Sequence, residues 1–151
     1  MLTAEQNEEL TSLGPGTPMG ELLRCYWYPI AFEEDFDSVP TKTVRLLGEN
    51  WTLFKTPKGG KYGIVAEHCP HRRASLTYGV VHEDGIRCGY HGWKFDFDGH
   101  CVEQPAESDN QNFRDRVQQK AGKAQTMAGM VWVYVGPSPA PELPRFDVFV
   151  M

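Results

Sequence analysis

Cysteine and histidine are scarce in this chain of 151 residues, which has four cysteines and five histidines. Two of the cysteines belong to a metal-binding pattern described below, and the other two lie far from it in sequence, so a disulfide framework is not expected. We expect Cys25 and Cys101 to be free thiols. Free cysteine is often buried, so we expect Cys25 in a core or half-buried position, whereas Cys101 follows a turn and is expected to be partly exposed.

Long apolar runs and an excess of basic residues are also missing. No run approaches the roughly 20 apolar residues of a membrane-spanning helix, so no membrane partner is expected. The chain has 15 Lys and Arg against 20 Asp and Glu, a net charge of -5, which argues against a nucleic-acid partner. Residues 1–10 have neither a basic stretch nor an apolar one, so no export or import signal is present and we expect a cytoplasmic protein.

The sequence contains no internal repeat, no glycine-rich phosphate loop and no dinucleotide-binding fingerprint. We therefore do not expect this chain to bind NADH or flavin by a known motif. The hydrophobic fraction of 40% and the aromatic fraction of 12% are typical of a globular protein. At this length the chain is expected to form one domain.

Two short segments carry the residues with the clearest metal chemistry. Cys69-Pro70-His71 and Cys88-Gly89-Tyr90-His91 each contain one thiol and one imidazole, with sixteen residues between His71 and Cys88. A structural zinc more often takes two like ligands from each half of its site. Mixed segments instead favour two irons: Cys69 and Cys88 on one, His71 and His91 on the other, with two bridging sulfides to complete a [2Fe-2S] cluster.

The two imidazoles change the charge of such a cluster. Two ferric ions, two sulfides and two thiolates sum to zero, whereas four thiolates would leave a charge of about minus two, so the histidine-ligated cluster accepts an electron more readily. An electron-transfer role follows. Gly89 and Gly92 would let backbone N–H groups approach the sulfides, and Pro70 would stiffen the first segment. A single structural zinc remains the alternative.

The N-terminal residues predict a short helical arm. Thr3 and Gln6 have the spacing of a capping box, and Gly14 ends the helix that they begin. A second helical turn is expected from Pro18 to about Arg24, with Thr17 as its cap.

The rest of the chain predicts an all-β fold of short antiparallel strands. Trp93, Phe95 and Phe97 alternate with polar residues, which predicts a half-buried strand followed by a hairpin turn at Asp98-Gly99. The acidic residues 33–37 are expected to form a solvated loop, and residues 105–116 are expected to be irregular. The other expected strands are 26–32, 42–47, 51–56, 62–66 and 130–135.

These residues resemble the N-terminal Rieske domain of the oxygenase component of Rieske non-heme iron oxygenases, particularly its phthalate-dioxygenase-like and O-demethylase-like branch. The resemblance is closest around the two segments and extends over nearly the whole chain. Thr126 is a departure, since the family more often has a glutamate there. Cytochrome-complex Rieske proteins differ by an extra cysteine in each segment. The shared residues are 69–72, 74–76, 85–88, 90–94, 98–99, 14–20, 22–24, Gly129, Trp132, Tyr134 and Gly136.

The resemblance implies a Rieske iron-sulfur fold with an arm at residues 1–24, the Rieske domain at 25–136 and a Pro-rich connector at 137–151. Residues 145–151 are apolar and strand-like, so we expect the protein to continue into a catalytic domain. The family's second, mononuclear iron is held there by two histidines and a carboxylate. This chain has no such set and no catalytic residues. The remaining histidines, expected at the surface, are His68, His82 and His100.

The resemblance also implies a function. The cluster would take electrons from an NADH-dependent reductase or a ferredoxin and pass them to the mononuclear iron of a neighbouring subunit in a ring-hydroxylating or O-demethylating oxygenase, a homo-oligomer expected to be a trimer. A stand-alone Rieske-type ferredoxin is the alternative. The helical arm and the Pro-rich connector favour the oxygenase, because a ferredoxin needs neither.

Overall fold

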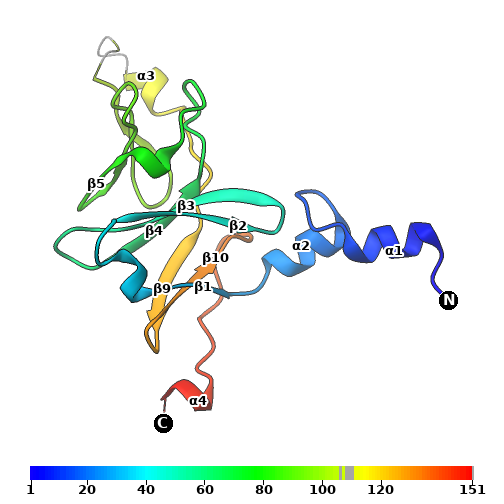
Figure 1. Ribbon diagram of the computed structural model, residues 1–151. Coiled ribbons are helices and arrows are strands. Elements are labelled where there is room, and N and C mark those ends of the chain that lie inside the picture. The colour runs from blue at the N-terminus through cyan, green and yellow to red at the C-terminus, as the bar shows by residue number, and fades with distance from the viewer. Residues whose placement is uncertain (106, 108–110, 151) are drawn as a thin grey trace.

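The computed structural model describes residues 1–105, 107 and 111–150 (Figure 1). The strands form three small antiparallel sheets, as the sequence predicts for an all-β fold. The first has the order β1-β10-β9, the second β2-β3-β4 and the third β5-β6-β7-β8. The strands are β1 (Tyr28–Phe32), β2 (Thr41–Leu46), β3 (Glu49–Lys55), β4 (Tyr62–Ala66), β5 (Val80–His82), β6 (Gly85–Arg87), β7 (Lys94–Phe95), β8 (Cys101–Glu103), β9 (Lys123–Met127) and β10 (Met130–Tyr134).

Strand β3 lies between two hydrophobic cores. Its side chains alternate between the two faces of the sheet. Trp51 and Leu53 belong to the core between the first two sheets, whereas Phe54 belongs to a second core beneath the third sheet. Both cysteines of the predicted cluster, Cys69 and Cys88, lie in this second core.

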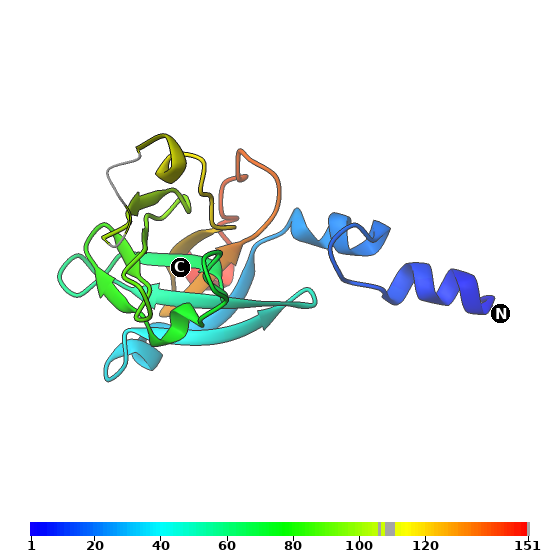
Figure 2. The same ribbon diagram turned by 90° about the horizontal axis from the view of Figure 1, so that it is seen from above.

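The N-terminal arm projects from the sheets as two short helices, α1 (Ala4–Thr11) and α2 (Pro18–Arg24) (Figure 2). The predicted caps are present, because the Thr3 hydroxyl accepts a hydrogen bond from the Gln6 N–H and the Gln6 side chain accepts one from the Thr3 N–H. Helix α1 has no buried residue. The attachment of the arm therefore depends on α2.

Arg24 anchors the arm to the second sheet. Its guanidinium donates to the carbonyl oxygens of Leu13 and Gly20 within the arm, at 3.2 and 2.9 Å. It also donates to the Leu47 carbonyl at 3.1 Å and to the Glu49 carboxylate at 2.8 Å. Because Arg24 is only 4% exposed, these bonds are shielded from water and join the arm firmly to the turn between β2 and β3.

The C-terminal segment packs against the first sheet. The indole N–H of Trp27 donates to the Pro141 carbonyl at 2.9 Å, and the rings of Trp132 and Phe146 stack 5.7 Å apart. The chain then ends in a short helix, α4 (Asp147–Val150), which contradicts the strand-like character predicted for residues 145–151, of which Met151 lies outside the described part. An aliphatic and aromatic run does not by itself distinguish a strand from a helical turn.

Three other sequence-based predictions were wrong in part. Residues Glu33–Phe36 form a 3₁₀ turn, η1, rather than a solvated loop, because Phe36 is buried beneath it. Within residues 105–116, of which 106 and 108–110 lie outside the described part, a short helix α3 (Gln111–Arg114) is present. The strand predicted from Trp93 to Phe97 is reduced to β7.

The two other cysteines also depart from prediction. Cys25 is exposed and forms the C-cap of α2. Cys101 is 4% exposed and lies in the second core, because β8 pairs with β7 beneath the cluster loops.

Candidate metal centre

The first cluster loop (residues 69–74) lies between β4 and a 3₁₀ turn, η2 (Leu76–Tyr78). Two backbone hydrogen bonds close it. The Cys69 N–H donates to the Ala74 carbonyl at 2.9 Å, and the Arg73 N–H donates to the Cys69 carbonyl at 2.9 Å. The Thr77 hydroxyl beyond the loop lies 2.9 Å from that of Thr52 on β3, so this loop is tied to the second sheet.

The second cluster loop (residues 88–93) joins β6 to β7 in the third sheet. The Cys88 N–H donates to the Trp93 carbonyl at 2.8 Å, and the Gly92 N–H donates to the Cys88 carbonyl at 3.1 Å. This is the bond pattern of the first loop, so both cysteines are held in the same local way. The Gly92 N–H is used within the loop, so any backbone N–H that approaches a sulfide here would come from a neighbouring residue.

The two cysteine side chains meet in the second core. Cys69 is 1% and Cys88 3% exposed, and their thiols lie close enough to interact electrostatically. Burial raises the pKa of the Cys69 thiol to about 11, opposed by the backbone N–H of His71 and increased by the Cys88 thiol. A buried thiol with a raised pKa remains protonated at neutral pH without a cation, whereas a bound metal displaces the proton. The donor set therefore fits a metal.

The two histidines meet as well. The ring centroids of His71 and His91 are 4.7 Å apart, and both side chains are half-buried. Burial, together with the neighbouring His71 and Arg72, lowers the pKa of His91. This shift favours the neutral imidazole, the form that binds metal ions.

The grouping of these four residues bears on the choice between iron and zinc. Among the described residues, no group of three or more His, Cys, Asp or Glu side chains is placed to hold one metal ion. A structural zinc needs four ligands around one ion, whereas a [2Fe-2S] cluster of this type needs two protein ligands on each iron. The structure places the cysteines as one pair and the histidines as another.

Aromatic residues border the histidines. The ring of Trp93 lies 4.4 Å from that of His71, with 5° between the planes, and the ring of Tyr90 lies 3.8 Å from that of His91. Trp93 is buried, whereas Tyr90 is 61% exposed. The sequence predicts Trp93 as part of a half-buried strand, and it gives no sign of this contact.

A charged network supports the second loop, and sequence reasoning missed it. The alternation of residues 93–97 places Lys94 in solvent, yet it is 6% exposed and its ammonium contacts Asp84 at 2.6 Å and Glu103 at 2.8 Å. Arg87 donates to Glu103 at 2.5 Å and to the Gly92 carbonyl at 3.2 Å. No sequence pattern indicates this pairing, because β6, β7 and β8 meet only in the folded sheet.

The three other histidines lie outside the two cluster loops. His100 is exposed and its ring nitrogen is 3.1 Å from the Asp96 carboxylate. His82 is half-buried, 3.3 Å from Arg87, and His68 is also half-buried. The prediction that all three are surface groups holds fully for His100 alone.

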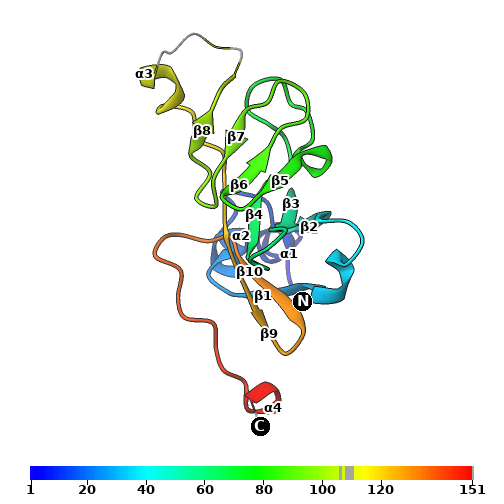
Figure 3. The same ribbon diagram turned by 90° about the vertical axis from the view of Figure 1, so that its left-hand side faces the viewer.

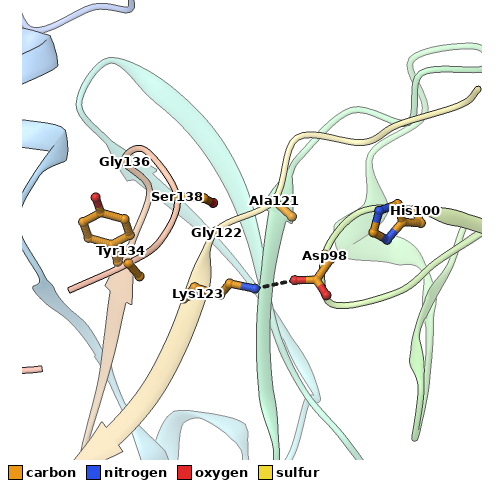
Figure 4. Close-up of a pocket in the computed structure, with 9 residues that line it drawn as sticks. Asp98, His100, Ala121, Gly122, Lys123, Tyr134, Gly136 and Ser138 are labelled. Carbon is orange, nitrogen blue, oxygen red and sulfur yellow. Dashed lines mark hydrogen bonds and ion pairs between the residues drawn. The ribbon is translucent and has the colours of Figure 1, made fainter. Parts of the chain in front are cut away.

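A separate cavity of about 220 Å³ lies between the hairpin turn after β7 and the C-terminal connector (Figure 4). Two of its lining residues, Lys123 and Asp98, form an ion pair with each other. The ring of a third, His100, contacts the Asp96 carboxylate. Its lining includes none of the four predicted ligands.

Comparison with known families identifies the fold. The family described as the Rieske [2Fe-2S] domain matches residues 26–119. The chain belongs to this family, which implies a [2Fe-2S] cluster. The oxygenase in its reduced complex with ferredoxin in carbazole 1,9a-dioxygenase superposes with a TM-score of 0.64 at 28% identity, covering 80% of this chain and 31% of that one. The Rieske fold predicted from sequence is confirmed.

Curated relatives define the branch. The oxygenase subunit of 5,5'-dehydrodivanillate O-demethylase from Sphingobium sp. is 51% identical over 99% of this chain and 36% of its own length. The oxygenase subunit of phthalate 4,5-dioxygenase from Pseudomonas putida is 40% identical over 97% of this chain and 33% of its own length. The chain thus spans about a third of these relatives and corresponds to the Rieske part of an oxygenase subunit.

Within the described residues, no helix combines the length and the apolar character that crossing a membrane requires.

Proposed function

We propose that Cys69 and Cys88 bind one iron of a [2Fe-2S] cluster, that His71 and His91 bind the other, and that the cluster transfers electrons. The observation that supports this assignment is the pairing across the two loops: the Cys69 thiol lies beside that of Cys88, and the His71 ring lies beside that of His91. When bound, the cluster supplies one-electron chemistry. The buried cysteines hold its inner side away from water, and the half-buried histidines place its other side near the surface.

We further propose that this electron transfer serves an oxygenase. The O-demethylase and dioxygenase names of the relatives support a role in the breakdown of aromatic compounds, with the mononuclear iron in a catalytic domain outside this chain. The oxygenase–ferredoxin complex among the similar structures supports a ferredoxin as electron donor, and an NADH-dependent reductase is the other donor that we propose. A cytoplasmic location would suit such a donor.

The arrangement of the chain supports transfer between subunits. The third sheet, which carries the second cluster loop, lies at the end of the molecule opposite α4 (Figure 3). A catalytic domain joined after the connector at residues 137–151 would begin far from the histidines of its own Rieske domain at residues 25–136. A homo-oligomer such as a trimer would bring the histidines of one subunit to the catalytic iron of another, with the arm at residues 1–24 free for other contacts.

Metal and sulfide analysis of the purified chain tests the ligand assignment. We expect about two irons and two acid-labile sulfides per chain. Changing Cys69 or Cys88 to Ser, or His71 or His91 to Ala, should abolish the cluster. The matched control His100→Ala should retain it, because His100 is exposed and lies outside both loops. One zinc per chain without sulfide would overturn the proposal.

A further inference from the structure

The two histidines of the site have unequal surroundings. His71, from the first loop, lies against the buried ring of Trp93. His91, from the second loop, lies against the largely exposed ring of Tyr90. Because Tyr90 and His91 are sequence neighbours, their contact is local. The contact between His71 and Trp93 joins one loop to the other.

The Trp93 ring is placed by packing and not by a hydrogen bond. Its indole nitrogen is buried and has no partner among the described residues. One neighbour is Phe113 of α3, whose ring meets it edge-on with centroids 6.1 Å apart. Its other ring neighbour is His71, at 4.4 Å with nearly parallel planes. A ring 3% exposed and held by such contacts has little freedom to turn.

A parallel neighbour restricts how an imidazole can rotate. A histidine ligand binds through one ring nitrogen, and the direction of that nitrogen changes as the ring turns about its bond to Cβ. Lying flat against Trp93, His71 cannot turn without losing the stacking contact. The Trp93 carbonyl also accepts a hydrogen bond from the Cys88 N–H. The residue that restrains His71 of the first loop is therefore fixed to the cysteine of the second loop.

We propose that Trp93 is a positioning residue for the cluster: it fixes the ring plane of His71 across the two loops, while Tyr90 makes no equivalent restraint on His91. This inference rests on the proposed function, since it concerns a ligand of the [2Fe-2S] cluster. It assigns to a buried aromatic residue the orienting role that hydrogen-bond partners usually have around metal-bound histidines.

The test uses the whole chain loaded with its cluster. Trp93→Leu removes the flat ring, Trp93→Phe keeps a smaller one, and Tyr90→Leu removes the aromatic partner of the other histidine as a matched control. Two readouts are taken: the hyperfine couplings of the ligand nitrogens in the dithionite-reduced cluster, and the rate at which a chelator removes iron. Thermal unfolding is measured alongside.

For Trp93→Leu we expect an altered coupling for one of the two histidine nitrogens and cluster loss faster by about tenfold, the scale of changes to partners of metal ligands. Trp93→Phe should fall between Trp93→Leu and the parent, and Tyr90→Leu should remain within about twofold of the parent.

Lower thermal stability with unchanged couplings would mean that Trp93 only fills the core, and the inference would be wrong. An equal effect of Tyr90→Leu would also contradict it. If Trp93→Leu takes up no cluster, the test rests on Trp93→Phe: an altered histidine nitrogen coupling would support the inference, and an unchanged one would contradict it. A parent chain without a [2Fe-2S] cluster would instead refute the proposed function.

Discussion

Arg73 and Gly92 occupy the same position in the two cluster loops, four residues after the cysteine, and both have a left-handed backbone, with φ of 59° and 78°. Glycine adopts this conformation without cost, whereas a residue with a Cβ atom is strained there. The two loops thus share their backbone course as well as their hydrogen bonds, although only the second uses the residue best suited to it.

Gly92→Ala should destabilise the protein by about 1–2 kcal/mol, because the added Cβ is strained at this φ and would lie 3.2 Å from Pro105. Arg73→Gly should change stability by less than about 1 kcal/mol, because the relief of strain is offset by a more flexible unfolded chain. Urea denaturation of both variants measures the difference. If Gly92→Ala were as stable as the parent, the second loop would not need its left-handed residue.

Arg24→Ala should loosen the helical arm. Removal of the guanidinium leaves the Leu13 and Leu47 carbonyls without this donor and Glu49 with Lys120 as its remaining ion-pair partner, at a cost of about 2–4 kcal/mol. Limited proteolysis should then cleave the arm faster. Arg45→Ala is the control, since Arg45 is exposed on the neighbouring strand and should change stability by less than about 0.5 kcal/mol. Equal protease resistance of Arg24→Ala and the parent would show that other contacts hold the arm.

Glu49 should make stability depend on pH in the acid range. Burial acts to raise the pKa of Glu49, but hydrogen bonds from Arg24 and Lys120 hold it below its ordinary value of 4.5. The ionised carboxylate therefore stabilises the folded state fully above pH 4.5, and this contribution is lost as the pH falls through the lowered pKa. The free energy of unfolding of Glu49→Gln should therefore fall less than that of the parent between neutral and acid pH. An identical pH profile for variant and parent would contradict this.

Lys94→Met should cost only about 1 kcal/mol, although Lys94 is buried. Its partners Asp84 and Glu103 have side chains 64% and 41% exposed, so water can solvate them once the ammonium is gone. Methionine preserves the length and the apolar character of the lysine stem. Denaturant titration checks the value. A loss above about 3 kcal/mol would mean that the carboxylates are left unsolvated.

Cys25 should be the first cysteine to react with iodoacetamide in the native protein. It is exposed, whereas the other three cysteines are buried, and burial raises the pKa of both Cys69 and Cys101. A thiol with a raised pKa has less of the reactive thiolate at neutral pH. Peptide mass spectrometry should find one modified cysteine in the native protein and four after unfolding. Early modification of Cys101 would contradict its burial.

The cluster loops could be predicted from sequence because their chemistry is local. Cys69 and His71 are two residues apart, and Cys88 and His91 are three apart. Because each pair is close in sequence, the pattern can be recognised without knowledge of the fold. The strands with aliphatic and aromatic runs, such as β3 and β10, could be predicted for the same reason.

What could not be predicted depends on distant parts of the chain. Strand β9 is largely polar, and its alignment beside β10 gives it an extended conformation that its own residues do not indicate. The burial of Lys94 requires carboxylates from β8 and from the turn before β6. Cys25 is exposed at the end of α2, although the aromatic residues that follow it in sequence suggest a buried position.

The two cluster loops belong to different sheets, so a cluster bound by both loops would connect the second sheet to the third. The first loop is attached to the second sheet through Thr77 and Thr52, and the second loop is part of the third sheet. A cluster held by one cysteine and one histidine from each loop would couple the unfolding of the two sheets into one transition. Without it, the β5–β8 sheet would be free to open at lower denaturant concentration than the sheet around Trp51, and cooperative unfolding would itself report that the cluster is in place.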